Sequence, residues 1–277
     1  MPDKEQHMME EMEIDLLLET IQRCYGYDFR DYARASVRRK VRDIASTVGV
    51  THISELIPRL IHDQQLFSSI VGIFSTPVTE MFRDPPFFKL VRDSVVPYLR
   101  TWPFVRIWLA GCASGEEVYS LAILLKEEGL YDHCTLFATD FVDASLHKAK
   151  EGIYPLRSMK TNIANYQNSG GRALFSDYYH ADYESVIMDA GLRENITFAN
   201  HNLVTDGVFS EMHLILCRNV MIYFNSNLQS RVLNLFHDSL LHGGLLALGS
   251  KESLHHHEFK DRFIELEPAW KIYRKIV

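Results

Sequence analysis

Apolar and polar residues repeat with two different periods along this chain. Up to about residue 80 the apolar positions recur every three to four residues, as in IDLLLETIQRCYGYDF from residue 14 and ISELIPRLIHD from residue 53. This spacing is typical of amphipathic helices, and no strand-like alternation interrupts it. We therefore expect a small all-helical unit, followed by a connecting helix over 85–100 that Pro85 and Pro86 open.

Beyond residue 100, short apolar runs alternate with helix-like segments, which favours a parallel sheet covered by helices on both faces. Gly243 and Gly244 are expected to cap the last of these helices. The segment 155–195 shows no legible pattern, and the first dozen residues, polar and Met-rich, are the one part expected to be disordered. The pattern predicts strands at 106–111, 134–140, 196–203, 212–219 and 245–250, helices at 118–129, 144–154 and 227–244, and a hairpin over 264–277.

Composition narrows the classes of function. The chain carries a net charge of −7, whereas proteins that bind nucleic acid usually have a basic excess, so we expect no nucleic-acid partner. No apolar run of about 18 residues appears, so we expect no membrane insertion. Cys24, Cys112, Cys134 and Cys217 lie far apart without a CxxC pair, which indicates buried free thiols in a reducing cytoplasm.

Small and acidic residues follow the first two predicted strands. The first ends in AGCASGEE, which includes Gly111, Glu116 and Glu117, and the second ends in Asp140. At the carboxyl ends of parallel strands, a small-residue loop lets a ligand approach the backbone, and an acidic residue can take both ribose hydroxyls. Carboxylates at the start of a helix oppose a pyrophosphate but suit a cationic ligand. S-adenosyl-L-methionine has this chemistry; the alternative is a tight turn with surface glutamates.

Arg83 stands just before this part of the chain, in TEMFRD. Its guanidinium could hold the methionine carboxylate of such a ligand through two parallel hydrogen bonds. The alternative is an ordinary surface arginine.

Five segments, in the same order, resemble the CheR family of chemotaxis receptor methyltransferases. They are FSTPVTEMFR (74–83), ASGEEVYS (113–120), ATD (138–140), NL (202–203) and CRNVMIYF (217–224), of which the last is the most specific. The resemblance implies an α/β fold: a Rossmann-like class I methyltransferase with a seven-stranded, mostly parallel sheet, preceded by a small all-α domain. It implies a helical substrate-docking domain over 1–82 and a catalytic, cofactor-binding domain over 83–277.

The resemblance also implies the site. The cofactor is S-adenosyl-L-methionine and the product S-adenosyl-L-homocysteine. Tyr223 is placed beside the transferring methyl group, so Arg83 and Tyr223 are the expected catalytic residues. The implied cofactor contacts are Thr79, Arg83, Glu117, Asp140, Asn202, Leu203, Arg218 and Asn219, to which the loop analysis adds Gly111.

Two positions depart from the family pattern. Pro77 stands where many relatives have an asparagine that contacts the cofactor. The segment SDYYHADYESVI (176–187) lacks the glycine-rich loop with which some relatives bind a receptor's C-terminal pentapeptide. We therefore expect no pentapeptide tethering.

The implied activity is transfer of a methyl group to glutamate side chains of a chemoreceptor, by a cytoplasmic monomer. A glutamate carboxylate is already ionised at neutral pH, and a sulfonium methyl is already activated. The reaction therefore needs alignment rather than a general base or a metal, and Tyr223 is interpreted as a positioning and electrostatic group. The alternatives are a methyltransferase acting on a small molecule or RNA, and a catalytically weak, cofactor-binding regulatory relative.

A basic stripe indicates where the substrate binds. Arg34, Arg38 and Arg42 are spaced by four residues on one helix face, with Arg39 adjacent. On an acidic protein this stripe suits an acidic partner, here the helical methylation region of a chemoreceptor-type protein. The alternative is a solvated face.

Three consecutive histidines, His255, His256 and His257, raise the question of a metal site. On an extended segment their side chains point to alternate sides, and no cysteine lies nearby to join them. We therefore expect no metal.

Overall fold

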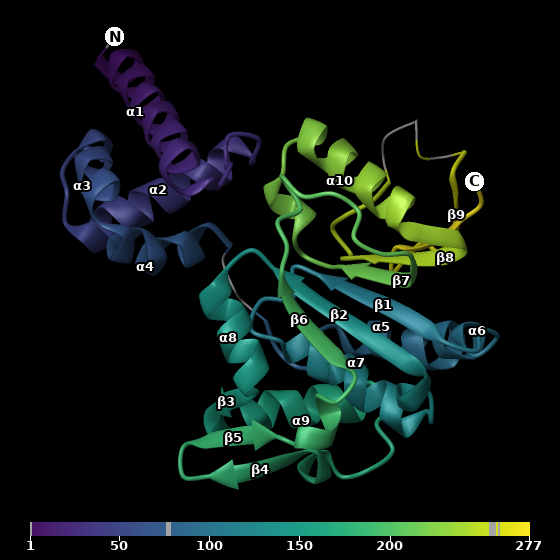
Figure 1. Ribbon diagram of the computed structural model, residues 1–277. Helices are drawn as coiled ribbons and strands as arrows, with labels where there is room; N and C mark the ends of the chain where they lie inside the picture. The colour runs from purple at the N-terminus through teal and green to yellow at the C-terminus, as the bar shows by residue number, and fades with distance from the viewer. Residues whose placement is uncertain (1, 76–78, 255–258, 260) are drawn as a thin grey trace. The chain divides into compact units, whose positions relative to one another are not determined.

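The computed structural model describes residues 2–75, 79–254, 259 and 261–277 (Figure 1). The chain forms two compact units. The first comprises Met1–Pro77 together with Ile222–Val232, and the second comprises Val78–Met221 and Leu233–Val277. The first unit thus includes Ile222–Val232 from a later part of the chain, whereas the sequence prediction set a single boundary after residue 82.

The first unit is helical, as the spacing of apolar residues predicts. Its packing residues recur at helical spacing, for example Ile14, Leu17, Leu18 and Ile21, all at most 1% exposed. The elements are α1 (Pro2–Tyr25), α2 (Arg34–Val48), the 3-10 helix η1 (Ile53–Glu55), α3 (Leu56–His62) and α4 (Gln64–Ser75).

The expected disorder of the first dozen residues was wrong, because α1 begins at Pro2. Carboxylates in this polar segment pair with arginines of α2, for example Glu10 with Arg42 at 2.5 Å. Local composition does not reveal partners that lie more than 20 residues away in the sequence.

The second unit is built on a seven-stranded sheet in the order β6-β2-β1-β7-β8-β10-β9. The first five strands are parallel to one another, and β10 pairs antiparallel with both β8 and β9. This confirms the predicted α/β class with a mostly parallel sheet and a C-terminal hairpin. The strands are β1 (Val105–Ala110), β2 (Cys134–Asp140), β6 (Ile196–Asn200), β7 (Met212–Cys217), β8 (Leu240–Leu248), β9 (Phe263–Glu267) and β10 (Ile272–Lys275).

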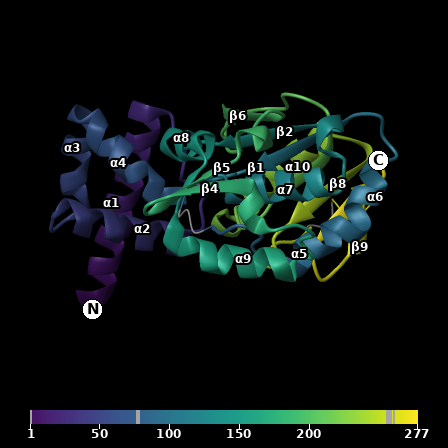
Figure 2. The same ribbon diagram turned by 90° about the horizontal axis from the view of Figure 1, so that it is seen from below.

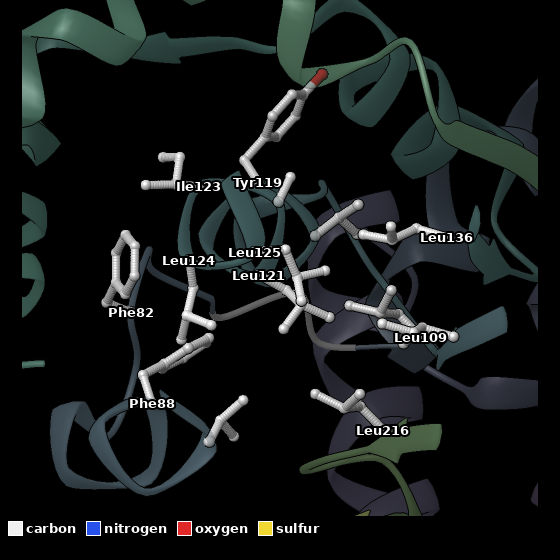
Figure 3. Close-up of a cluster of buried hydrophobic side chains, with 14 of the residues drawn as sticks. Phe82, Phe88, Leu109, Tyr119, Leu121, Ile123, Leu124, Leu125, Leu136 and Leu216 are labelled. Carbon is white, nitrogen blue, oxygen red and sulfur yellow. The ribbon is translucent and has the colours of Figure 1, made fainter. Parts of the chain in front are cut away.

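Successive residues of a strand point to opposite faces of the sheet, and those of β1 and β7 are buried on both faces. Other elements must therefore cover both faces of the sheet. Leu109 of β1, with Leu136 and Leu216 of the neighbouring strands, joins the apolar cluster around Leu121 and Leu124 of α7 (Figure 3). Figures 1 and 2 show the helices of this unit. They are α5 (Pro85–Leu90), the π-helical turn η2 (Val91–Val95), α6 (Val96–Leu99), α7 (Glu116–Glu127) and α8 (Asp143–Glu151), with short 3-10 turns η3 (Tyr131–His133) and η6 (Ala190–Leu192). The residues of the 3-10 turn η7 (Met221–Tyr223) and of α10 (Ser226–Ser239) are divided between the two units.

The stretch without a legible pattern forms a small layer of its own. Its three-stranded antiparallel sheet has the order β3-β5-β4. These strands have three or four residues each, too short to produce a periodic signal. The elements are β3 (Ile153–Pro155), η4 (Leu156–Ser158), α9 (Met159–Asn168), η5 (Phe175–Tyr178), β4 (Tyr179–Asp182) and β5 (Ser185–Met188).

The predicted role of Gly243 and Gly244 as a helix cap was wrong. Helix α10 ends at Ser239, and both glycines lie inside β8. The register with β7 shifts between Met212 and Leu214, and Gly243 has a φ of +79°. The glycines therefore form a bulge, where a left-handed residue is needed.

The four cysteines are free thiols, and three of them are buried. Cys112, Cys134 and Cys217 are buried free thiols as expected, whereas Cys24 is exposed. Among helices of the described residues, none combines the length and apolar character needed to span a bilayer.

Candidate functional site

The ends of β1 and β2 are joined by backbone bonds around Asp140. The amides of Gly111 and Cys112 both donate to the carbonyl of Thr139, at 2.8 and 2.9 Å. The Asp140 carboxylate accepts from the amides of Ala113 and Val142, both at 2.9 Å. Asp140 is 6% exposed, and its burial raises the pKa of the carboxyl despite these amide donors. The predicted acidic group is therefore fixed at the loop that the sequence singled out.

Two glycines make close approaches possible at this loop. Gly111 has a φ of +77°, and a Cβ there would lie 2.6 Å from the Val220 side chain. Gly115, with a φ of +93°, would meet Ala149 at 2.9 Å. Any larger residue would push apart the ends of β1, β7 and α8, so the loop needs glycine at both positions.

Arg218 follows β7 and is the buried cation of the site. Its guanidinium donates to Glu117 at 2.5 Å and to Asp84 at 2.6 Å, and it lies 3.9 Å from the centre of the Phe87 ring. The residue is 7% exposed. Its Nε is buried without a hydrogen-bond partner among the described residues. A buried N–H group without an acceptor is uncommon, and a polar ligand could supply the missing acceptor.

Arg83 lies in a backbone segment with unusual geometry. Its neighbours Phe82 and Asp84 have φ angles of +52° and +59°, a region that costs energy for residues with a Cβ. Phe82 is fully buried, and its amide donates to the hydroxyl of Ser120 at 2.8 Å. The surroundings therefore fix the backbone on both sides of Arg83, which is itself half-buried.

Two site residues escaped the sequence analysis. Asp84 pairs with Arg218, and the only signal for it was its place directly after Arg83. Glu252 is 5% exposed and accepts from the amides of Asn219, Val220 and Gly249 at 3.0, 2.9 and 2.6 Å. It thereby holds the loop after β7, in which Asn219 has a φ of +62°. No sequence pattern could reveal Glu252, because its partners are backbone groups.

The predicted pair Asn202 and Leu203 follows β6, the neighbour of β2. The amide of His201 donates to the Asp140 carbonyl at 3.2 Å, which ties this segment to the end of β2. The Asn202 side-chain oxygen accepts from the amide of Val204 at 3.0 Å, and Leu203 is 7% exposed. Thr79 is half-buried.

Within the second unit, the structure thus brings most predicted cofactor residues to one edge of the sheet. Asp140 is the last residue of β2, and Glu117 lies in the first turn of α7. The residues directly after β1 and β7 are Gly111, Arg218 and Asn219. This edge holds the carboxylates of Glu117 and Asp140 beside the guanidinium of Arg218. Burial also raises the pKa of the neighbouring Glu116 carboxyl. An acidic edge of this kind fits a cationic ligand that carries hydroxyl groups. S-adenosylmethionine meets this description.

Pro77 and the three histidines 255–257 lie outside the described residues. In the part of the chain that the structure describes, no group of three or more His, Cys, Asp or Glu side chains could hold a metal ion.

Tyr223 belongs to the first unit. Its carbonyl accepts from the amide of Ala33 at 2.7 Å, and the Lys40 ammonium lies 4.2 Å from the centre of its ring. Lys40 is 2% exposed and donates to the carbonyl of Phe74. Burial, with a smaller effect of the Arg39 charge, lowers the pKa of Lys40 to about 8.

The lowered pKa of Lys40 predicts a pH-dependent stability. Between pH 8 and 10.5 the unfolded chain holds the Lys40 proton while the folded chain has lost it, so the free energy of unfolding should rise with pH in this window. Below pH 8 the cost of burying the ammonium is fully present. We expect Lys40→Met to abolish a rise of about 3 kcal/mol, measured by chemical denaturation. The exposed Lys126→Met is the control, and a rise that persists in Lys40→Met would contradict the assignment.

The predicted basic stripe is paired within the chain. Arg34 contacts Asp15 at 2.7 Å and also Glu11, while Arg38 donates to Glu11 at 2.8 Å. Arg42 contacts Glu10. Arg39 is exposed and pairs with none of these carboxylates in the described residues. Within the described residues, α1 thus pairs with all three arginines of the stripe and not with the adjacent Arg39.

Comparison with known proteins gives matches over both units. The model of the CheR methyltransferase SAM-binding domain matches residues 77–271, and that of the CheR methyltransferase all-alpha domain matches residues 12–72. A protein of Pseudomonas putida named "Putative methyltransferase Cher3" is 49% identical over 265 residues, covering 96% of this chain and 97% of that protein. A "Chemotaxis protein methyltransferase" of Listeria innocua is 30% identical over 251 residues, covering 89% and 93%. The "Chemotaxis protein methyltransferase 1" of Vibrio cholerae is 28% identical over 238 residues, covering 83% and 84%.

Proposed function

The chain belongs to the CheR methyltransferase family and uses S-adenosylmethionine as its cofactor, and we propose on this basis that it methylates glutamate side chains of a chemoreceptor-type protein. The family and the cofactor were both predicted from the sequence, and the two domain matches confirm both predictions. The observation that carries the proposal is the pairing of a SAM-binding domain with the family's all-alpha domain in one chain. We also propose that the protein acts in the cytoplasm as a monomer and binds no nucleic acid.

The cofactor is proposed to bind at the acidic edge of the sheet. Asp140 would accept hydrogen bonds from the ribose hydroxyls with a carboxylate that the amides of Ala113 and Val142 already hold in place. Glu117 would face the ammonium group of the methionine portion, and Arg83 its carboxylate. Gly111 supports the shape of this edge, because its lack of a Cβ lets the Val220 side chain pack against the loop after β1.

The proposed reaction needs little acid–base chemistry. The cofactor supplies a methyl group already activated by its sulfonium. The attacking glutamate oxygen is ionised at neutral pH, so the protein has to remove no proton. What its residues contribute is alignment of the attacking oxygen with the methyl carbon, which is worth about 7–11 kcal/mol when the geometry is right. We propose that Tyr223 and Arg83 carry this alignment.

The proposed substrate segment is an acidic helix. Its carboxylates would be recognised by the arginines of α2, namely Arg34, Arg38, Arg39 and Arg42, through an attraction that also raises the association rate. The helical unit would therefore select the protein substrate, while the second unit holds the cofactor.

Base-labile methyl transfer tests the proposal. The protein is incubated with a receptor fragment and cofactor that carries a labelled methyl group, and the methanol released by alkali is counted. Carboxyl methyl esters release methanol, whereas N-methyl groups and methyl ethers do not. We expect release that depends on glutamates of the fragment. Cofactor binding without any transfer would favour the regulatory relative, and alkali-stable label would indicate a different acceptor.

Arg83→Ala tests the cofactor carboxylate contact. We expect the affinity for S-adenosylhomocysteine to fall about ten- to a hundredfold, the effect of losing charge-assisted hydrogen bonds worth about 1.5–3 kcal/mol. The thermal unfolding temperature, measured in parallel, separates loss of the ligand contact from damage to the fold. Calorimetry of Lys89→Ala, an exposed cation in the adjacent helix α5, is the matched control. Unchanged affinity in Arg83→Ala would return it to the role of a surface arginine.

A further inference from the structure

Helix α1 consists of two parts that are held in different ways. From Ile14 onward it packs through the apolar residues Ile14, Leu17, Leu18 and Ile21. Over residues 4–13 no side chain is buried, and Met8, Met9 and Met12 are 64%, 54% and 49% exposed. We call residues 4–13 together with Asp15 the acidic segment. Hydrophobic packing therefore anchors only the second part of α1.

Ion pairs with α2 hold the acidic segment instead. Arg42 donates to both oxygens of Glu10, at 2.5 and 2.8 Å, and this hydrogen bonding lowers the pKa of Glu10. Arg38 and Arg34 share Glu11, and Arg34 also contacts Asp15. Arg34, at the start of α2, contacts Asp15, whereas Arg42, two turns later, contacts Glu10, which lies earlier in α1. The two helices are therefore antiparallel at this contact.

These contacts are of a kind that exchanges readily. The paired arginine side chains are 27–62% exposed, so water and salt screen the attraction. Glu13 adds hydrogen bonds from the amide and the hydroxyl of Ser54, at 3.3 and 2.5 Å. A segment held by polar contacts of this kind opens at lower cost than one packed in a core. The arginines remain in place when it opens, because α2 is anchored by its own buried residues Val37, Val41 and Ile44.

We propose that the face of α2 formed by Arg34, Arg38 and Arg42 is a binding surface for an acidic amphipathic helix, and that the acidic segment of α1 is its resident occupant, which the substrate helix displaces. The inference rests on the proposed function for the identity of the incoming helix. The pairing in α1 indicates the binding mode: an incoming helix lies antiparallel to α2 and presents carboxylates about one turn apart. The acidic segment thus reduces binding of weakly acidic helices.

Neutralising the resident carboxylates tests the exchange. The full chain with Glu10→Gln and Glu11→Gln is compared with wild type for binding of a Glu-rich amphipathic helical peptide, by surface-based kinetics at low salt. We expect the association rate constant to rise about tenfold, because Arg38 and Arg42 no longer have to release a charged partner and Arg34 keeps only Asp15. The control is Glu5→Gln with Glu19→Gln, which removes the same charge from α1 but no partner of α2. A rate equal to or below wild type, or an equal rise in the control, overturns the proposal.

Hydrogen exchange on the wild-type chain gives a second readout that needs no variant to fold. Addition of the peptide should accelerate exchange of the amides in residues 4–13, while those from Leu17 to Tyr25 keep their protection. Unchanged exchange in 4–13 on a saturated complex overturns the proposal. Both measurements record binding alone, so a failure of methyl ester formation would count against the proposed function and leave this inference standing.

Discussion

Arg218→Met is expected to lower the free energy of unfolding by about 3–5 kcal/mol. Removing one partner of a buried ion pair leaves the other charge without compensation, and that cost exceeds the value of the pair itself. Here two carboxylates are affected, Glu117 and Asp84, which Arg218 contacts at 2.5 and 2.6 Å. Cofactor affinity should fall as well, because Glu117 would no longer be held in place.

Chemical denaturation of the full chain measures this effect. The matched control is Arg106→Met, which removes an exposed arginine from β1 and should change stability by less than about 0.5 kcal/mol. Adding Glu117→Gln to Arg218→Met should restore part of the lost stability, since it removes one of the uncompensated charges. A loss below about 1 kcal/mol in Arg218→Met would show that the guanidinium is not the organising charge of the site.

Asp140→Asn is expected to lower the affinity for S-adenosylhomocysteine by about 3–6 kcal/mol, a hundredfold to ten-thousandfold. The two charge-assisted hydrogen bonds that we propose between Asp140 and the ribose would be lost or weakened, each worth about 1.5–3 kcal/mol. The amide also disturbs the loop. Asp140 accepts from the amides of both Ala113 and Val142, whereas an asparagine has one acceptor oxygen and would direct its own N–H toward one of them.

Calorimetric titration with S-adenosylhomocysteine avoids turnover and gives the affinity directly. Asp132→Asn, an exposed carboxylate just before the opposite end of β2, is the control and should bind like wild type. The thermal unfolding temperature, measured in parallel, separates loss of ligand contacts from damage to the loop. Wild-type affinity in Asp140→Asn would contradict the ribose assignment.

Several features followed from the sequence because their signals are local. The strand over 134–140 matches β2 residue for residue, and the strand over 212–219 contains β7. Apolar residues of consistent spacing specify such elements without reference to the rest of the chain. The strands in turn predicted that Gly111 and Asp140 lie close together, since the carboxyl ends of neighbouring parallel strands meet at one edge of a sheet.

Other features are not encoded locally. The short strands β3, β4 and β5 give no periodic signal, and the bulge at Gly243 and Gly244 resembles a helix cap in the sequence because glycine serves both. Glu252 carries no recognisable pattern, as its partners are backbone amides. Only the assembled fold defines these roles.

The sequence by itself determined the family, the order of strands and helices around the large sheet, and the loop with its acidic residues, because each depends on residues close together in the chain. The tertiary structure decided which charges meet. Arg218 pairs with Asp84 across 134 positions, and Arg34 and Arg38 pair with Glu11 across 23 and 27. A row of arginines has the same spacing whether it faces water or a carboxylate, so its partners become known only when the chain has folded.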